Sequence, residues 1–353
     1  MSDSPPAAAA VPPLLAIDIG AGTQDILLYD PAAEPENCVK LVLPSQTHVV
    51  GRRIRQATAR DSAVHLEGPL MGGGASSDAA LAHIAAGLPL TATPTAAATM
   101  HNNPERVLGM GVRIVDAAPA GAEIVRTGDL DLPALAAALA PFGVDLPASV
   151  AVAVQDHGDR PGSGTNEVRF EYLQGLLDGG GDLAGAIFAA APPGMTRMAA
   201  VQHAIPGAWV MDTGAAAVLG SLADPAVSRA AAGSGAIVVN FGNMHTFATL
   251  VKGRRLYGLF EHHTGGMTTG LAARLVGLLR DGSLDVARFR ETFDGHGAAL
   301  DPAYQAEGPF PFVAVTGPRR AIARPLGFHE AAPHGDMMLA GPWGLVEALR
   351  LRG

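Results

Sequence analysis

Short apolar runs separated by a glycine turn open the chain. Leu14–Ile19 (LLAIDI) is followed by the turn GAGT, by a second run, Gln24–Asp30 (QDILLYD), and by a third, Cys38–Pro44 (CVKLVLP). This alternation predicts three strands in a meander. Most parallel-sheet folds begin β-α-β instead, so the start of this chain is distinctive.

Helical and extended patterns alternate after this opening. They predict an α/β fold whose mixed sheets are flanked by helices. The expected helices are Val50–Ala59, Ser77–Ala86, Leu132–Ala140 and Glu167–Leu177, and the expected strands include Ala63–Leu66, Ser149–Val154 and Leu183–Ala189.

The opening pattern recurs about 220 residues later. Gly235–Asn240 is a nearly continuous apolar run, followed by the turn FGN, a second run, His245–Val251, and a third, Arg255–Phe260. Two copies of one strand-turn-strand device predict two related lobes that face each other.

The expected boundary between these lobes lies near Pro206–Val210, just before a helix at Gly214–Leu222. We therefore expect a disordered Pro/Ala-rich segment at 1–13, lobe I at 14–208 and lobe II at 209–353. The C-terminal helix is expected to pack back toward lobe I.

The segment Asp18–Asp25 (DIGAGTQD) has the chemistry of a phosphate-binding hairpin. Gly20 and Gly22 allow a bulky anion to approach the backbone, so that N–H groups point at phosphate oxygens. Thr23 adds a hydroxyl donor, and Asp18 is suited to hold Mg²⁺ through water. An ordinary glycine hairpin is the alternative for this motif alone.

Two other phosphate-binding motifs are excluded. The chain has no GxxxxGK[ST], so it lacks a P-loop, and the residues after Gly22 predict a strand where a dinucleotide-binding fold would have a helix.

With these motifs the chain resembles the actin, sugar-kinase and Hsp70 (ASKHA) ATPase superfamily, which implies a two-lobed actin-like ATPase fold with ribonuclease H-like sheets. The motifs that carry the resemblance are Asp18–Asp25 (first phosphate motif), Met211–Gly220 (first connecting helix), Ile237–Thr246 (second phosphate motif) with the TGGMT of Thr264–Thr268, Phe312–Arg320 (adenosine motif) and Met338–Ala348 (second connecting helix).

The resemblance implies ATP or ADP and Mg²⁺ as cofactors. The cofactor-binding residues that it implies are Gly20, Gly22, Thr23, Gln24, Asn240, Gly242, Asn243, Thr246, Gly265, Gly266, Gly317 and Arg319. The catalytic candidates are Asp18, Asp212 and His245, to which Asp156 is added because it follows the apolar strand Ser149–Val154.

One residue departs from the pattern of the superfamily. The second phosphate strand ends in Asn240 where these families usually carry Asp. An amide can bind a phosphate or a metal-bound water, but it cannot act as a general base. Fast phosphoryl transfer is therefore in doubt, and Asp212 or His245 would have to orient the attacking water.

More closely, the chain is similar to a prokaryotic family sometimes labelled "putative pyruvate formate-lyase activating enzyme". The similarity rests on DIGAGTQDILLYD, ENCVKLVLPS, MGGGAS, ERVLGMGV and QDHG. Activation by radical chemistry needs a CxxxCxxC cluster motif, and this chain has one cysteine, Cys38. We therefore reject that label as a description of its chemistry.

Two further features are open at this stage. The glycine run Gly72–Gly74 precedes an expected helix, so it could bind a substrate anion or be a simple loop. The histidines lack the i, i+4 or HxH spacing of a metal site, and a dedicated transition-metal site is not expected.

Composition and charge narrow the function classes. Forty-eight per cent of the residues are hydrophobic, as in a folded globular protein, and the net charge of −9 opposes binding to nucleic acid or to an anionic membrane. The single cysteine fits a reducing cytoplasm. The remaining hypotheses are a kinase acting on a small metabolite, a slow ATPase that activates a partner enzyme, and a nucleotide sensor.

Overall fold

The computed structural model describes residues 11–352 except 161, 164 and 165. Most of the expected N-terminal segment therefore lies outside the described residues, while Val11 is already buried. Among the described residues, none of the helices combines the length and the apolar character needed to cross a membrane.

The first sheet grows from the expected meander. It has six strands in the order β3-β2-β1-β8-β10-β9, in which β1, β8 and β10 are parallel and β2, β3 and β9 run antiparallel to their neighbours. Their bounds are β1 Leu14–Ile19, β2 Thr23–Tyr29, β3 Val39–Pro44, β8 Ser149–Val154, β9 Ile187–Phe188 and β10 Trp209–Asp212.

The second sheet repeats this arrangement. Its order is β14-β13-β12-β11-β15-β16, with β12 antiparallel to β11 and β13, and with β11, β15 and β16 parallel. The bounds are β11 Ala236–Phe241, β12 His245–Lys252, β13 Arg255–His263, β14 Gly297–Leu300, β15 Phe312–Thr316 and β16 His329–Glu330.

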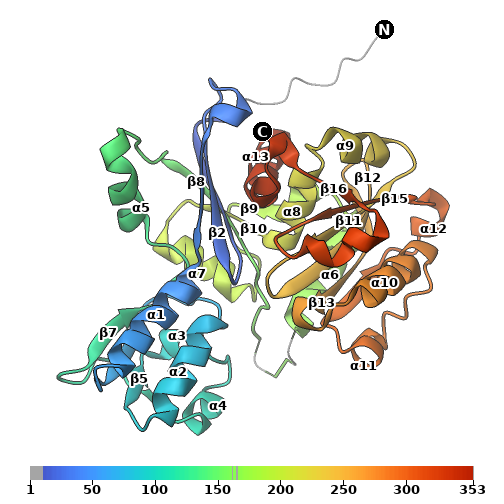
Figure 1. Ribbon diagram of the computed structural model, residues 1–353. Coiled ribbons are helices and arrows are strands. Elements are labelled where there is room, and N and C mark those ends of the chain that lie inside the picture. The colour runs from blue at the N-terminus through green and yellow to red at the C-terminus, as the bar shows by residue number, and fades with distance from the viewer. Residues whose placement is uncertain (1–10, 161, 164–165, 353) are drawn as a thin grey trace.

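Apart from one edge strand in each, β9 in the first and β14 in the second, both sheets thus share the strand order 3-2-1-4-5 of a ribonuclease H-like unit. Two helices cross between them, α8 (Thr213–Ser221) and α13 (Ala340–Arg352), as Figure 1 shows. The helices cross at small residues: a Cβ on Gly220 would collide with the backbone of Ala340, and one on Gly344 with that of Ala216. The expected two-lobed fold with crossing helices is therefore confirmed.

The same helices carry the core that joins the lobes. One hydrophobic cluster includes Leu14 and Ala16 of β1, Val238 of β11, Leu219 of α8 and Leu345 of α13. α13 also contacts β1, β2 and β8, so the C-terminal helix does pack against the first sheet.

A third sheet was not expected from the sequence. Its four strands are all parallel, in the order β6-β5-β4-β7, and with their helices they form a separate unit between β3 and α5 (Leu132–Leu139), with its own hydrophobic core. Its elements are α1 Gln46–Thr58, β4 Val64–Glu67, α2 Ala75–Ala85, β5 Leu90–Ala92, α3 Pro94–Ala97, α4 Pro104–Gly109, β6 Arg113–Ile114 and β7 Glu123–Arg126.

Two other expectations need correction. Leu183–Ala189 is not one strand but a 3-10 turn, Leu183–Ala186, followed by the short β9. β10 pairs with β8, so the first sheet extends to Asp212, beyond the expected boundary at 208. The remaining helices are α6 Glu167–Asp178, α7 Thr196–Ala204, α9 Pro225–Ala232, α10 Thr269–Asp281, α11 Phe289–Phe293 and α12 Tyr304–Glu307.

Candidate functional site

The two glycine hairpins face each other across a cleft between the lobes. The cleft encloses about 730 Å³, part of it open to solvent. Eight of the residues expected to form the site line it: Asp18, Gly20, Thr23, Asn240, Gly242, Asn243, His245 and Gly317. The hairpins meet where the side chain of Asn243 lies against Gly22, at a place that a Cβ would fill.

Backbone hydrogen bonds shape both turns. In the first hairpin the Gly20 N–H donates to the Thr23 carbonyl at 2.9 Å, and the hydroxyls of Ser45 and Thr47 donate to the Ala21 carbonyl at 2.8 and 2.9 Å. In the second hairpin the Gly242 N–H donates to the His245 carbonyl at 2.9 Å. Both loops are therefore held in shape by the protein itself.

A pair of buried carboxylates lies beside the first hairpin. Asp18 and Asp25 are direct partners across β1 and β2, so their side chains point to the same face. Asp18 Oδ1 accepts a hydrogen bond of 2.5 Å from the Thr213 hydroxyl, and its carboxylate lies against Gly341 at the start of α13. Asp25 Oδ1 meets no hydrogen-bond donor within the described part of the chain.

Burial governs the protonation of this pair. It raises the pKa of Asp18 to about 7, and burial together with the negative charge of Asp18 raises the pKa of Asp25 to about 8. Two adjacent carboxyl groups that resist ionisation are a favourable place for a cation, which would supply the missing counter-charge. The sequence analysis had singled out only Asp18.

A buried ion cluster closes the floor of the cleft. The guanidinium of Arg169, on α6, lies 2.5 Å from Asp212 Oδ2 and 2.6 Å from Glu261 Oε2, and all three side chains are almost fully buried. Asp212 also caps α8 through a 2.9 Å hydrogen bond from the Gly214 N–H. Asp212 therefore joins structural elements and is not the exposed carboxylate that water activation would need.

Asp156 is likewise engaged in holding the structure together. Its carboxylate accepts the N–H groups of Gly158 at 2.8 Å and Met198 at 2.9 Å, and the side chain is 1% exposed. Asp156 does not line the cleft. The expectation that it acts as a base is therefore not supported, because both oxygens are used to fix the loop that follows β8.

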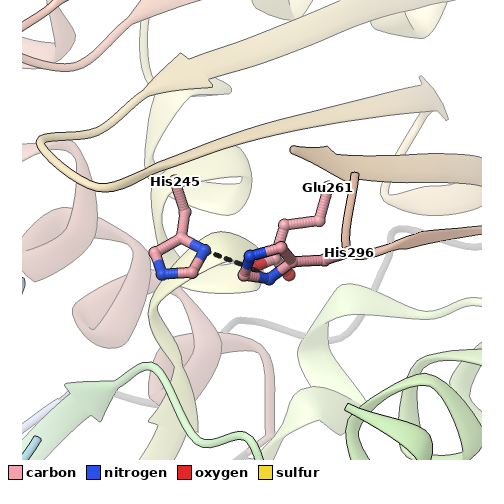
Figure 2. A group of neighbouring side chains, drawn as sticks. All are labelled: His245, Glu261 and His296. Carbon is pink, nitrogen blue, oxygen red and sulfur yellow. Dashed lines mark ion pairs between the residues drawn. The ribbon is translucent and has the colours of Figure 1, made fainter. Parts of the chain in front are cut away.

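Four histidines and one glutamate form a wall beside the second hairpin, and two of these residues, His245 and Glu261, line the cleft. His245 Nδ1 lies 2.9 Å and His296 Nδ1 3.2 Å from Glu261 Oε1 (Figure 2). The rings of His263 and His157 pack around them, with centroids 4.1 Å and 5.8 Å from that of His296. Three further histidines and one glutamate thus gather around His245, which the sequence had indicated as a catalytic candidate.

Burial and neighbouring charge keep these groups in defined states. Burial lowers the pKa of His245, and burial with the nearby Arg169 charge lowers that of His157 to about 3. Burial by itself would favour the neutral form of Glu261, but the Arg169 guanidinium holds its pKa well below the ordinary value. The wall therefore combines the neutral imidazoles of His157 and His245 with the ionised carboxylate of Glu261.

Several expected cofactor residues lie outside the cleft lining. Gln24 is buried and donates from Nε2 to the Pro44 carbonyl at 3.0 Å, and the Thr246 hydroxyl pairs with that of Thr264 at 3.0 Å. Gly265 and Gly266 form a 3-10 turn, Thr264–Gly266, after β13. These residues support the two hairpins and do not face the cleft.

Gly317 and Arg319 lie where β15 meets the second hairpin. Gly317 has a positive φ of 90°, and a Cβ there would collide with Asn240 Oδ1. The Arg319 N–H donates to the Phe241 carbonyl at 2.9 Å. Only the glycine lines the cleft, next to Pro318, Met337 and Met338.

The sequence analysis missed Asp25, Arg169, Glu261, His296 and Gly341. The sequence does mark Asp25, because it follows the turn at the same number of residues by which Asp18 precedes it. Glu261 is an acidic residue inside an apolar strand, which also marks it. No local pattern marks Arg169 or His296, because their neighbours are brought together only by the tertiary fold.

The duplicated sheets, the crossing helices and the cleft between two glycine hairpins define a protein of the actin-like ATPase fold class. A family model described as "Putative pyruvate format-lyase activating enzyme (DUF1786)" matches residues 71–322. The chain belongs to this family.

Other comparisons add little. No curated protein matches the sequence. Among solved structures the chain is similar to the ethanolamine utilization protein EutJ from Carboxydothermus hydrogenoformans, with 12% identity and a TM-score of 0.33 over 98% of this chain and 92% of that one. The assignment of the fold class rests on the strand order and the crossing helices of this chain.

Proposed function

We propose that the cleft binds ATP or ADP with Mg²⁺ and that the protein transfers the terminal phosphoryl group to a small metabolite. The observation that supports this most directly is the pair of glycine hairpins that face each other beside Asp18 and Asp25. Backbone N–H groups of such hairpins orient phosphate oxygens. The carboxylate pair would hold Mg²⁺ through water.

The cleft also offers a place for the base of the nucleotide. Gly317, Pro318, Met337 and Met338 line it together, and the side chains of the last three are apolar. Bound ATP would supply the phosphoryl group, and Mg²⁺ would offset its charge. The protein's own part is then to position the phosphates and to exclude water, which accounts for most of the catalysis of phosphoryl transfer.

A second function, slow ATP hydrolysis that regulates a partner enzyme, is favoured by one feature. The carboxylates that could serve as a general base are engaged elsewhere, Asp212 with Arg169 and Asp156 with two backbone N–H groups, and Asn240 cannot accept a proton. Turnover distinguishes the two functions. Phosphate release without an acceptor indicates the ATPase, and turnover that depends on one metabolite in a screen indicates the kinase.

Nucleotide binding itself is tested by thermal shift. ATP, ADP and AMP are added with and without Mg²⁺ to the wild type, to Asp18→Ala and to Asp116→Ala, a control that removes an exposed carboxylate. Ligands that bind only the folded state raise the melting temperature. We expect Mg²⁺-ADP to stabilise the wild type and the control but not Asp18→Ala. If no nucleotide shifts the wild type, the proposal fails.

A further inference from the structure

Three side chains from neighbouring strands of the second sheet meet beside the cleft (Figure 2), and two of them, His245 and Glu261, line it. His245 begins β12, Glu261 lies near the end of β13, and His296 directly precedes β14. Their ligand atoms all lie within 4.8 Å of one another. We infer that His245, Glu261 and His296 hold a divalent first-row transition-metal ion such as Zn²⁺ or Fe²⁺.

The orientation of the two imidazoles supports a shared ligand. Both Nδ1 atoms lie close to Glu261 Oε1, at 2.9 Å for His245 and 3.2 Å for His296. Neither has the alignment of a hydrogen bond, and within the described chain both nitrogens are buried without a hydrogen-bond partner. Buried nitrogens are rarely left so, because each loses its hydrogen bonds to water on burial and gains none in return. An ion between the three groups would satisfy them all.

Outer contacts orient two of the three side chains, His296 and Glu261. The Nε2 atom of His296 lies 3.0–3.1 Å from the ring nitrogens of His263. Glu261 accepts from Arg169 Nε at 2.6 Å on Oε2 and from Gln155 Nε2 at 2.5 Å on Oε1. Metal-bound imidazoles and carboxylates characteristically have such second partners, which orient them toward the ion.

The donor set indicates the class of ion. Two imidazole nitrogens and one carboxylate suit Zn²⁺ and Fe²⁺, whereas Mg²⁺ prefers oxygen ligands. The charges also permit a cation, because one positive group, Arg169, is outweighed by two negative ones, Asp212 and Glu261. Three protein ligands leave coordination positions open, and His245 and Glu261 line the cleft. Those positions would therefore take an oxygen ligand from the cleft.

The three ligands are far apart in the sequence, so no local spacing motif indicates this site. His245 faces His263 in the register of β12 and β13, Glu261 pairs with Phe247, and the backbone N–H of His296 donates to the Glu261 carbonyl at 2.9 Å. Strand pairing therefore brings the three ligands together over distances of 16 and 35 residues along the sequence. Spacing within single helices and strands, on which the expectation of no transition-metal site rested, cannot show such a ligand set.

Metal content tests the inference without any nucleotide. Tag-free protein is stripped with a chelator, dialysed against Zn²⁺, and analysed by inductively coupled plasma mass spectrometry. We expect about one ion per chain. In His296→Ala and Glu261→Gln the affinity should fall about tenfold or more. His48→Ala, which removes an exposed histidine on α1, should retain the ion.

Co²⁺ provides an independent measurement, because its visible absorption reports nitrogen and oxygen ligation directly. Circular dichroism checks that each variant is folded, and His245→Ala replaces His296→Ala if the latter is not. Equal binding by the wild type and by folded variants, or no binding by the wild type, overturns the inference. Binding of Mg²⁺-ADP without binding of Zn²⁺ would overturn the metal site and leave the proposed function intact. Binding of Zn²⁺ without binding of any nucleotide would support the metal site and overturn the proposed function.

Discussion

At the scale of the residue, Arg169 links the two large sheets at the cleft. It joins Asp212, at the end of β10 in the first sheet, to Glu261 on β13 in the second. Each partner has a further task, since Asp212 caps α8 and Glu261 orients two histidines. Removal of this one guanidinium would leave two buried carboxylates without a counter-charge.

We therefore expect Arg169→Met to lower the free energy of unfolding by about 3–5 kcal/mol, the usual cost of breaking a buried ion pair on one side. Urea denaturation followed by circular dichroism measures this. The matched control is Arg160→Ala, whose pair with Glu171 is half exposed on both sides and should contribute far less to stability. Equal losses in the two variants would contradict the assignment.

The carboxylate pair gives a prediction about pH. The pKa of Asp25 is about 8 in the folded chain, against 3.8 for the ordinary group, so between these pH values the folded state binds more protons than the unfolded one. Stability therefore falls as the pH rises through this window. In chelator-treated protein, Asp25→Asn should melt at a higher temperature than the wild type at pH 8.5 but not at pH 4.

Differential scanning calorimetry at the two pH values measures this difference. Addition of Mg²⁺ at pH 8.5 should stabilise the wild type, because the cation neutralises two adjacent carboxylates, Asp18 and Asp25. It should leave the stability of Asp25→Asn nearly unchanged, because that variant has only the carboxylate of Asp18. A wild type whose melting temperature does not fall between pH 5 and pH 8 would argue against the raised pKa of Asp25.

At the scale of the element, features that depend on neighbouring residues could be predicted from the sequence. The strands β1, β2, β11 and β12 follow from apolar runs around glycine turns, and the crossing of α8 and α13 follows from their small residues. Features that depend on pairing between strands could not. The histidine and glutamate wall needs the register of β12 against β13, which no local pattern fixes.

The crossing of α8 and α13 makes a sharp prediction about glycine. A Cβ on Gly344 would overlap the Ala216 backbone, which cannot move without separating the two helices. Gly344→Ala should therefore lower the free energy of unfolding by about 1–3 kcal/mol through overpacking. Thermal unfolding measures the change.

The control is Gly277→Ala on α10, where an added Cβ meets no atom of the described residues within 4 Å. That substitution should stabilise the protein by about 0.5–1 kcal/mol, because alanine loses less backbone entropy than glycine in a helix. Opposite signs for two Gly→Ala changes within helices would show that close backbone contact, and not helix propensity, governs the crossing.

At the scale of the whole molecule, the inserted sheet β6-β5-β4-β7 lies apart from the cleft. Its core, which includes Val50, Leu66 and Val125, shares no residue with the clusters of the two larger sheets in the described chain. Its strands are only two to four residues long, which is too short for an alternation of apolar and polar residues to be recognised. From the sequence β4 was therefore expected, but the sheet was not. The two large lobes have longer strands, and their duplication was visible.

This separation predicts which segments of the chain a bound nucleotide protects from hydrogen exchange. Hydrogen exchange of backbone amides, followed by mass spectrometry, should slow with Mg²⁺-ADP in peptides from the two hairpins and from the start of α13, because these segments line the cleft. Peptides of β4 to β7 should not change, since no described residue of that sheet lines it. Asp18→Ala should abolish the slowing. Protection confined to the inserted sheet would instead show that the nucleotide binds there. The two hairpins would then be structural turns without a role in nucleotide binding.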